Sequence, residues 1–278
     1  MAPLTHYLHD GLTFDVRDAG PRDGQTVVLL HGFPQDGSAY DRVVPALHQQ
    51  GYRTLVPDQR GYSPGARPRG AWRYRIPDLV GDVVALLDAA GVFAAHVVGH
   101  DWGAGVAWEL ARRHPDRVVS LTALSVPHPA AMAAAARRPA QARRSWYMAA
   151  FQVPLVERLL APRLADGYVS LGVRADAAER YGRRFGEPGA LTGPVNWYRG
   201  LKYVAWDAAG RRIPREVHVP TLFVWGNADP YIDRSAAELC ERYVASDFHF
   251  VELDAGHWLP ENESGAVVSL ILDHLAGG

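Results

Sequence analysis

A short glycine-rich turn around Asp101 contains the side chain whose type and position are best suited to chemistry. Residues 99–103 read Gly-His-Asp-Trp-Gly, which is the G-x-S-x-G spacing of a turn that exposes a nucleophile, with aspartate in place of serine. An expected strand over 95–99 precedes the turn and an expected helix over 103–114 follows it. The simpler alternative is a glycine-rich turn in which Asp101 only caps that helix.

An aspartate at the tip of such a turn favours attack on saturated carbon. Serine would form a stable ether there, whereas a carboxylate is already ionised near neutral pH and forms an ester. Activated water can then cleave this ester at its carbonyl carbon. An aspartate at position 101 therefore predicts a reaction that breaks a bond between a saturated carbon and either an epoxide oxygen or a halide.

Two polar residues follow Asp101 in the order acid and then histidine. Asp229 lies just after an expected strand over 219–226, and His257 lies just after one over 247–254. We expect His257 to act as the general base and Asp229 to fix its tautomer and stabilise its charged form. Each residue alone has a plain structural explanation, because Asp-Pro opens turns and histidine is common in loops.

Two backbone amides are expected to stabilise the anion that forms when the ester is cleaved. The loop HGFPQ over 31–35 follows an expected strand, and in this arrangement it supplies one N–H donor, assigned here to Phe33. The residue after the nucleophile, Trp102, supplies the other. We interpret His31, in the same loop, as structural.

The elements that position these residues alternate between strand and helix. Apolar strands are expected over 26–30, 53–58, 95–99, 118–126, 219–226 and 247–254. Amphipathic helices are expected over 38–50, 77–91, 103–114, 233–244 and 261–275, after an N-terminal hairpin. This order predicts an α/β fold with a mostly parallel, doubly wound sheet.

The alternation stops in the middle of the chain. Residues 128–213 contain no comparable apolar strand and read as short helices separated by prolines. We therefore expect a helical cap over 128–213, inserted into a core made of 1–127 and 214–278. An epoxide oxygen leaves as an alkoxide and needs a proton, which a cap tyrosine such as Tyr147 or Tyr198 can donate. A halide would need N–H donors and no proton.

The composition is that of an ordinary globular protein. The chain has 278 residues, of which 48% are hydrophobic and 21% charged, with a net charge of −1. Near-zero charge suggests neither a nucleic acid nor a membrane as partner. The single cysteine, Cys240, cannot pair within the chain, and no Cys/His cluster has metal-ligand spacing, so we expect no metal and no cofactor. The N-terminus lacks a signal-peptide pattern, which predicts a cytoplasmic location, and the Ala-, Arg- and Gly-rich composition hints at a bacterium.

Over nearly its whole length the sequence resembles the epoxide hydrolases of the α/β-hydrolase superfamily. The matching segments are HGFP, PDQRGY, GHDWGA, VPHP, WYMAAFQ, NWYR, GNAD and AGHW. The resemblance implies an α/β-hydrolase fold with the nucleophile at Asp101, the acid at Asp229 and the base at His257. It also implies that Tyr198 and Tyr147 hold and protonate the epoxide oxygen.

We therefore expect an enzyme that converts a small apolar epoxide and water into a vicinal diol, acting as a monomer or homodimer. Its pocket is expected to include Phe33, Trp102, Met148 and Phe151. One alternative is a haloalkane or haloacid dehalogenase, which shares the Asp nucleophile, but Phe33 offers no side-chain donor to a halide. Another is a non-catalytic ligand-binding protein on a hydrolase scaffold.

Overall fold

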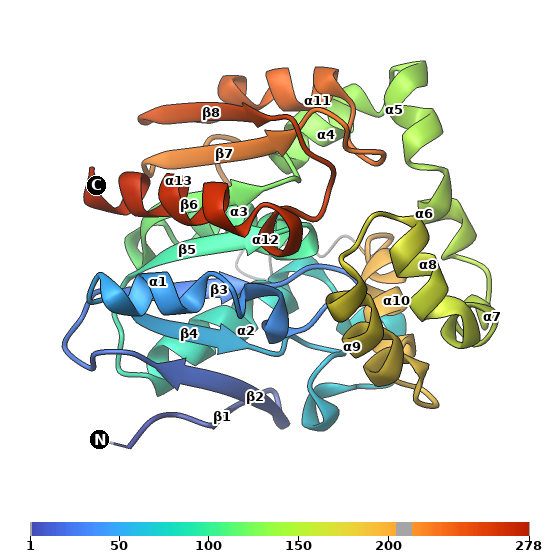
Figure 1. Cartoon of the computed structure of the whole chain (residues 1–278), viewed down its shortest axis with the longest axis horizontal. Helices are drawn as coiled ribbons and strands as arrows, with labels where there is room; N and C mark the ends of the chain where they lie inside the picture. The colour runs from blue at the N-terminus through green and yellow to red at the C-terminus, as the bar shows by residue number, and fades with distance from the viewer. Residues whose placement is uncertain (1, 204–212, 278) are drawn as a thin grey trace.

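The computed structural model describes residues 2–203 and 213–277, and its centre is one eight-stranded sheet (Figure 1). The strand order is β1-β2-β4-β3-β5-β6-β7-β8. The strands are β1 (His6–His9), β2 (Leu12–Ala19), β3 (Thr26–Leu30), β4 (Arg53–Pro57), β5 (Ala95–His100), β6 (Val118–Leu124), β7 (Thr221–Gly226) and β8 (Phe248–Leu253). Among the described strands, β1 with β2 and β2 with β4 pair in antiparallel fashion and the other five pairs are parallel, so the mostly parallel sheet is confirmed.

Helices cover both faces of the sheet, which explains the continuous apolar runs of its central strands. On one face lie α1 (Val44–Gln49), α12 (Leu259–Asn262) and α13 (Ser264–Ala276). On the other lie α2 (Ile76–Ala89), α3 (Trp102–Arg113) and α11 (Arg234–Glu238). Alternate residues of β3 therefore pack on opposite faces of the sheet. Val28 and Leu30 belong to the hydrophobic core on the side of α2 and α3, and Val27 and Leu29 to the core on the side of α1 and α13.

The helical insertion lies between β6 and β7. It comprises α4 (Pro129–Ala135), α5 (Pro139–Arg144), α6 (Trp146–Ala150), α7 (Val156–Leu160), α8 (Leu164–Ser170), α9 (Ala175–Gly186) and α10 (Thr192–Gly200). Helices α5 to α10 stand beyond one end of the sheet, on the right in Figure 1. Helix α4, which we had counted with the cap, packs beside α11. Residues 204–212 of the expected cap lie outside the described residues.

Three expected helices are shorter than their patterns suggested. The helix predicted over 38–50 is a 3₁₀ turn over Gly37–Tyr40 followed by α1, which begins at Val44 with Pro45 in its first turn. Proline has no N–H to donate and is accepted only at the start of a helix, so it separates the two pieces. The helix predicted over 233–244 likewise divides into α11 and a 3₁₀ turn over Cys240–Tyr243, and the last one into α12 and α13.

Candidate active site

Asp101 lies at the tip of the sharp turn between β5 and α3. Its backbone has φ 53° and ψ −120°, a conformation that non-glycine residues rarely adopt. The flanking glycines leave no room for a side chain: a Cβ on Gly99 would lie 2.3 Å from the carbonyl oxygen of Gly103, and one on Gly103 would lie 2.1 Å from that of Leu30. Such strain persists only where the surroundings enforce it, and here it holds a carboxylate at the sheet edge.

The side chains of His257 and Asp229 meet Asp101 at this edge. His257 Nε2 lies 3.3 Å from Asp101 Oδ2, and His257 Nδ1 lies 2.7 Å from Asp229 Oδ2. The other oxygen of Asp229 accepts hydrogen bonds from the amides of Tyr231 at 2.7 Å and Ile232 at 3.0 Å. The three side chains thus form a continuous chain of contacts, and the Asp229 carboxylate is fixed by backbone donors.

Charge pairing sets the protonation states of this group. Burial lowers the pKa of His257, but the charges and hydrogen bonds of Asp229 and Asp101 outweigh burial and raise this pKa to about 10. Burial raises the pKa of Asp101, but the hydrogen bond and charge of His257 outweigh it and hold this pKa below its ordinary value. In the free protein at neutral pH, Asp101 is therefore a carboxylate paired with an imidazolium.

The loop after β3 reaches over Asp101. The amide of Phe33 donates to Asp101 Oδ1 at 2.7 Å. Trp102 is the first residue of α3, where backbone N–H groups have no partner within the helix. His31 accepts a hydrogen bond from the amide of Gln59 at 3.2 Å and is fully buried, which suits a structural role.

Buried polar side chains hold this loop and the backbone of His257 in place. Gln35 accepts from the amide of Gly32 at 2.7 Å and donates to Glu261. The carbonyl oxygen of His257 lies 2.9 Å from His100 Nε2 and accepts from Ser125 Oγ at 2.7 Å. Burial lowers the pKa of His100 to about 4, so His100 is neutral and does not compete for protons.

A cavity of about 790 Å³ opens above Asp101 and His257, between the core and the cap. Phe33, Tyr147, Phe151 and Tyr198 are among its lining residues. Two residues that we expected in the pocket, Trp102 and Met148, are not among them. The Trp102 ring packs against the rings of Tyr198 at 5.1 Å and Trp197 at 5.5 Å between centroids, so it supports the pocket wall from behind.

Tyr147 on α6 and Tyr198 on α10 lie together in this cavity, with ring centroids 5.9 Å apart. Burial raises the pKa of both phenols well above the ordinary value, so both hydroxyls remain protonated. The hydroxyls of two other cap tyrosines are already engaged, because Tyr168 donates to the carbonyl of Pro34 and Tyr181 to Glu261.

Tyr231 also lines the cavity and was not predicted from the sequence. The Tyr231 ring lies 5.3 Å from that of Tyr147 and 4.9 Å from that of His257. Its position two residues after Asp229 was the signal that could have identified it, because the segment after a triad acid starts at the same sheet edge.

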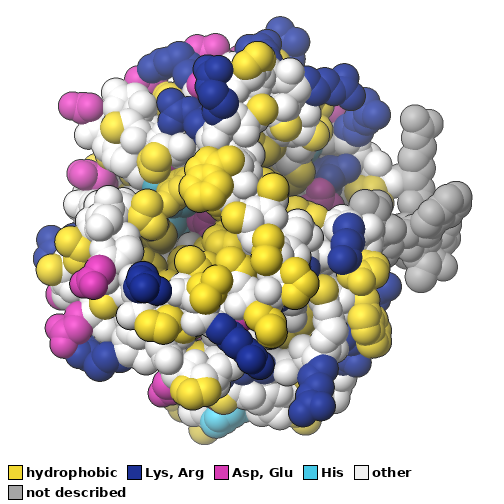
Figure 2. All heavy atoms as spheres, turned by 90° about the vertical axis from the view of Figure 1, so that its right-hand side faces the viewer, with side chains coloured by type: hydrophobic (Ala, Val, Ile, Leu, Met, Phe, Trp, Pro, Cys, Tyr) yellow, Lys and Arg dark blue, Asp and Glu magenta, His cyan; other side chains and the backbone are white. Residues whose placement is uncertain are grey.

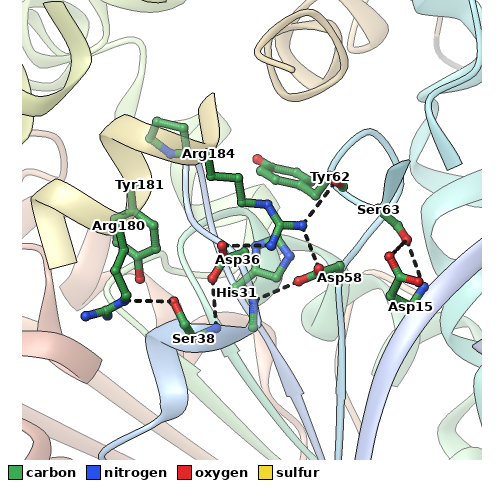
Figure 3. A network of polar contacts seen from close by, with 12 residues as sticks. Asp15, His31, Asp36, Ser38, Asp58, Tyr62, Ser63, Arg180, Tyr181 and Arg184 are labelled. Carbon is green, nitrogen blue, oxygen red and sulfur yellow. Dashed lines mark hydrogen bonds and ion pairs between the residues drawn. The ribbon is translucent and has the colours of Figure 1, made fainter. Parts of the chain in front are cut away.

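Arg184 on α9 ties the cap to the loops that carry the site (Figure 3). Its guanidinium donates to Asp36 Oδ2 at 2.9 Å and to Asp58 Oδ2 at 2.6 Å. Asp36 caps the 3₁₀ turn through the amide of Ser38, and Asp58 accepts from the amide of Gly37 at 3.0 Å. One cap residue therefore joins the chain after β3 to the chain after β4.

The described residues contain neither a metal site nor a membrane-spanning helix. Within residues 2–203 and 213–277, no three His, Cys, Asp or Glu side chains lie where they could hold a metal ion. No helix in these same ranges is long and apolar enough to cross a membrane.

The sheet order and the nucleophile turn define the class of protein. A family model for the alpha/beta hydrolase fold matches residues 25–264, and the chain belongs to this family. The chain is 35% identical over 277 residues to AB hydrolase superfamily protein YfhM of Bacillus subtilis, covering 96% of this chain and 95% of that protein. It is 32% identical over 313 residues to Epoxide hydrolase A of Mycobacterium tuberculosis, with the same two coverages.

Solved structures of epoxide hydrolases have the same fold over their full lengths. One from metagenomes of hot environments superimposes with a TM-score of 0.85 at 26% identity, covering 100% of this chain and 99% of that one. A mutant enzyme from Bacillus megaterium, complexed with its product (R)-3-[1]naphthyloxy-propane-1,2-diol, gives a TM-score of 0.84 at 26% identity, with 98% and 99% covered. The resemblance to epoxide hydrolases is thereby confirmed.

Proposed function

We propose that this protein hydrolyses epoxides to vicinal diols through a covalent ester on Asp101. The observation that carries the proposal is the single cavity in which the ionised Asp101 lies together with two protonated phenols, Tyr147 and Tyr198. An epoxide needs these two features at once, a nucleophile for its carbon and an acid for its oxygen. The product bound by the Bacillus megaterium relative supports an apolar epoxide as the substrate class.

In the first half-reaction, the Asp101 carboxylate attacks one epoxide carbon and the carbon–oxygen bond breaks. Tyr147 or Tyr198 gives its proton to the oxygen that leaves, so the product is a hydroxyalkyl ester and a tyrosinate. Phe33 N–H donates to Asp101 Oδ1 and His257 Nε2 lies 3.3 Å from Oδ2, so both oxygens of the nucleophile are held in place before the attack. The reaction needs no base at this stage because Asp101 is ionised before the substrate binds.

In the second half-reaction, His257 becomes the base as a consequence of the first. The negative charge of Asp101 is one of the causes that raise the pKa of His257, and ester formation removes this charge. The pKa of His257 then falls, so the imidazolium gives its proton to the tyrosinate, and the neutral imidazole accepts a proton from the water that attacks the ester carbonyl carbon. The amides of Phe33 and Trp102 stabilise the oxyanion, and its collapse releases the diol and leaves the Asp101 carboxylate paired with the imidazolium again.

The experiment that tests this proposal is a single turnover of the His257→Gln variant, read by intact-protein mass. Styrene oxide should add its whole mass to the peptide that carries Asp101, because the ester forms but is not hydrolysed. 1-Bromobutane, tested in parallel, should give no adduct. An alkyl adduct from the bromide alone would assign the site to a dehalogenase, and no adduct from either compound would favour a binding protein.

The structure gives the dehalogenase alternative little support. A halide needs N–H donors that face the cavity. Phe33 has no side-chain donor, and the Trp102 indole is directed toward Tyr198 and Trp197 and does not line the cavity.

A further inference from the structure

The cap exposes large apolar side chains around the mouth of the cavity. Six of them are between 48% and 69% exposed: Trp146, Val153, Leu155, Leu159, Val169 and Leu171. Trp146 and Leu171 also line the cavity, so the exposed apolar surface continues into it. Figure 2 looks onto this side of the molecule and shows hydrophobic side chains gathered around a hollow, with Lys and Arg side chains around them.

Three arginines belong to the same surface. Arg143 and Arg163 line the cavity next to the apolar residues, and Arg158 precedes Leu159 on α7. In the described part of the chain, Arg143 and Arg158 have no side-chain hydrogen bond or ion pair, and Arg163 donates only to the carbonyl of Leu159 at 3.5 Å. We call these three arginines and the six apolar residues the cap face.

The charge of the chain is distributed very unevenly. Residues 128–203 contain twelve Arg and Lys residues against five Asp and Glu, whereas the whole chain contains 29 against 30. The cap is therefore strongly cationic and the core strongly anionic. Our expectation that no membrane takes part used only the net charge, which conceals this separation.

From these observations we infer that the cap face docks onto an anionic lipid surface. Exposed apolar side chains that can enter the acyl boundary, together with unpaired cations that attract anionic headgroups, are the two contributions that hold proteins at bilayer interfaces. Contiguous exposed apolar patches of this kind mark interaction sites. Docking would place the cavity mouth against the lipid, where apolar epoxides concentrate, and this consequence rests on the proposed function while docking itself does not.

Charge also favours a lipid surface over a second copy of the chain. A symmetric dimer through the cap face would place the patch that holds Arg143, Arg158 and Arg163 against the same patch of a second copy, and like charges across an interface are unfavourable. An anionic bilayer satisfies all three arginines with opposite charge and receives the apolar residues between them.

Flotation of the full-length protein with vesicles tests this inference. We expect binding to vesicles of phosphatidylcholine mixed with phosphatidylglycerol, and much weaker binding to phosphatidylcholine alone or at high salt. Leu159→Ser should lower the partition constant about tenfold. The matched control is Leu8→Ser in β1, since Leu8 is 72% exposed on the core and Leu159 is 69% exposed on the cap.

Charge reversal gives a second, independent pair of variants. Arg158→Glu should weaken binding to the anionic vesicles by about fivefold or more, whereas Arg242→Glu, an exposed arginine of the core, should not. None of these four residues lines the cavity. Hydrolysis of a water-soluble epoxide should therefore be unchanged in all four variants, which separates this test from the test of the reaction.

Three results would overturn the inference. The first is a wild-type protein that does not float with the anionic vesicles. The second is an equal loss of binding in the core variants Leu8→Ser and Arg242→Glu. The third is a dimer in solution, measured by light scattering, that dissociates in the Leu159→Ser or Arg158→Glu variant. The cap face would then be covered by another copy of the chain.

Discussion

The core and the cap of this protein hold their site residues by different means. Strands β3, β4, β5 and β7 are buried at every residue, whereas α6, which carries Tyr147, contributes no buried residue. Asp101 is fixed by a glycine-lined turn at the end of one of these strands. Asp101 therefore follows a fully buried strand, whereas Tyr147 lies on a short helix without buried residues and Tyr198 on the mostly buried α10.

In the proposed reaction the two regions take different parts. The core would supply Asp101, His257 and Asp229 to form and cleave the ester, and the cap would supply Tyr147 and Tyr198 to open the epoxide. Variants of Asp101 and of the cap tyrosines should therefore fail at ester formation, and variants of His257 at ester hydrolysis.

Asp101→Asn should have the largest effect, because it removes the nucleophile of the core. We expect diol formation to fall at least about ten-thousand-fold. The control is Asp254→Asn, an exposed aspartate three residues before His257, which should keep full activity. Undiminished turnover in Asp101→Asn would contradict the mechanism.

Tyr198→Phe should slow the first half-reaction by roughly ten- to ten-thousand-fold, because the alkoxide loses a proton donor. Stopped-flow measurement should show slower ester formation and unchanged ester hydrolysis. Tyr203→Phe, at a cap tyrosine that is 41% exposed, is the matched control. Tyr231→Phe should be measured in the same way. If it slows ester formation more than Tyr198→Phe does, Tyr231 is the proton donor.

The pH dependence should separate the two steps. Ester hydrolysis needs neutral His257, so its rate should rise about tenfold per pH unit below the pKa of His257 in the ester, and then level off. This pKa lies below the value of about 10 in the free enzyme, because the charge of Asp101 is gone. Ester formation, which needs ionised Asp101 and a protonated tyrosine, should be constant around neutral pH.

A histidine NMR titration provides the direct check of that shift. The pKa of His257 should be lower in Asp101→Asn than in the wild type, because the substitution removes the same charge as ester formation does. An unchanged pKa would mean that Asp229 alone keeps His257 protonated, and His257 could then not become a base.

Arg184→Met should have the smallest effect, since it acts where the cap meets the core. It leaves Asp36 and Asp58 without their shared cation, which should lower the free energy of unfolding by about 1–3 kcal/mol. We expect a higher KM with a smaller change in kcat. Among the described residues the neighbouring Arg183 pairs only with exposed Glu179, so Arg183→Met should change stability little. Equal effects of the two variants would remove Arg184 as the link between the regions.

The triad was predictable from the sequence because its members follow strand ends. Asp101, Asp229 and His257 come after strands that run in the same direction, so a linear pattern of strands places all three at one edge. The glycines that allow the turn are local as well. The fold class was predictable for the same reason, since each strand and helix has its own periodic signal.

The polar scaffold and the pocket wall carry no such local signal. Gln35 and Glu261 are hydrogen-bonded although 226 residues separate them, and nothing in either segment indicates the other. Met148 follows Tyr147 on a five-residue helix, too short for its apolar pattern to define which face meets the cavity. Trp102 lies where expected in the chain, but packing against Trp197 of the cap determines the direction of its ring.

The insertion point of the cap determines which parts of the protein can be replaced without disturbing the sheet. Strands β6 and β7 pair directly with each other, so everything between them is one long crossover connection. Exchanging that connection for another leaves every strand with the same neighbours and leaves Asp101, Asp229 and His257 in the unexchanged segments. A different insertion can therefore change the cavity wall and the exposed surface of the cap while the three residues at the sheet edge keep their positions.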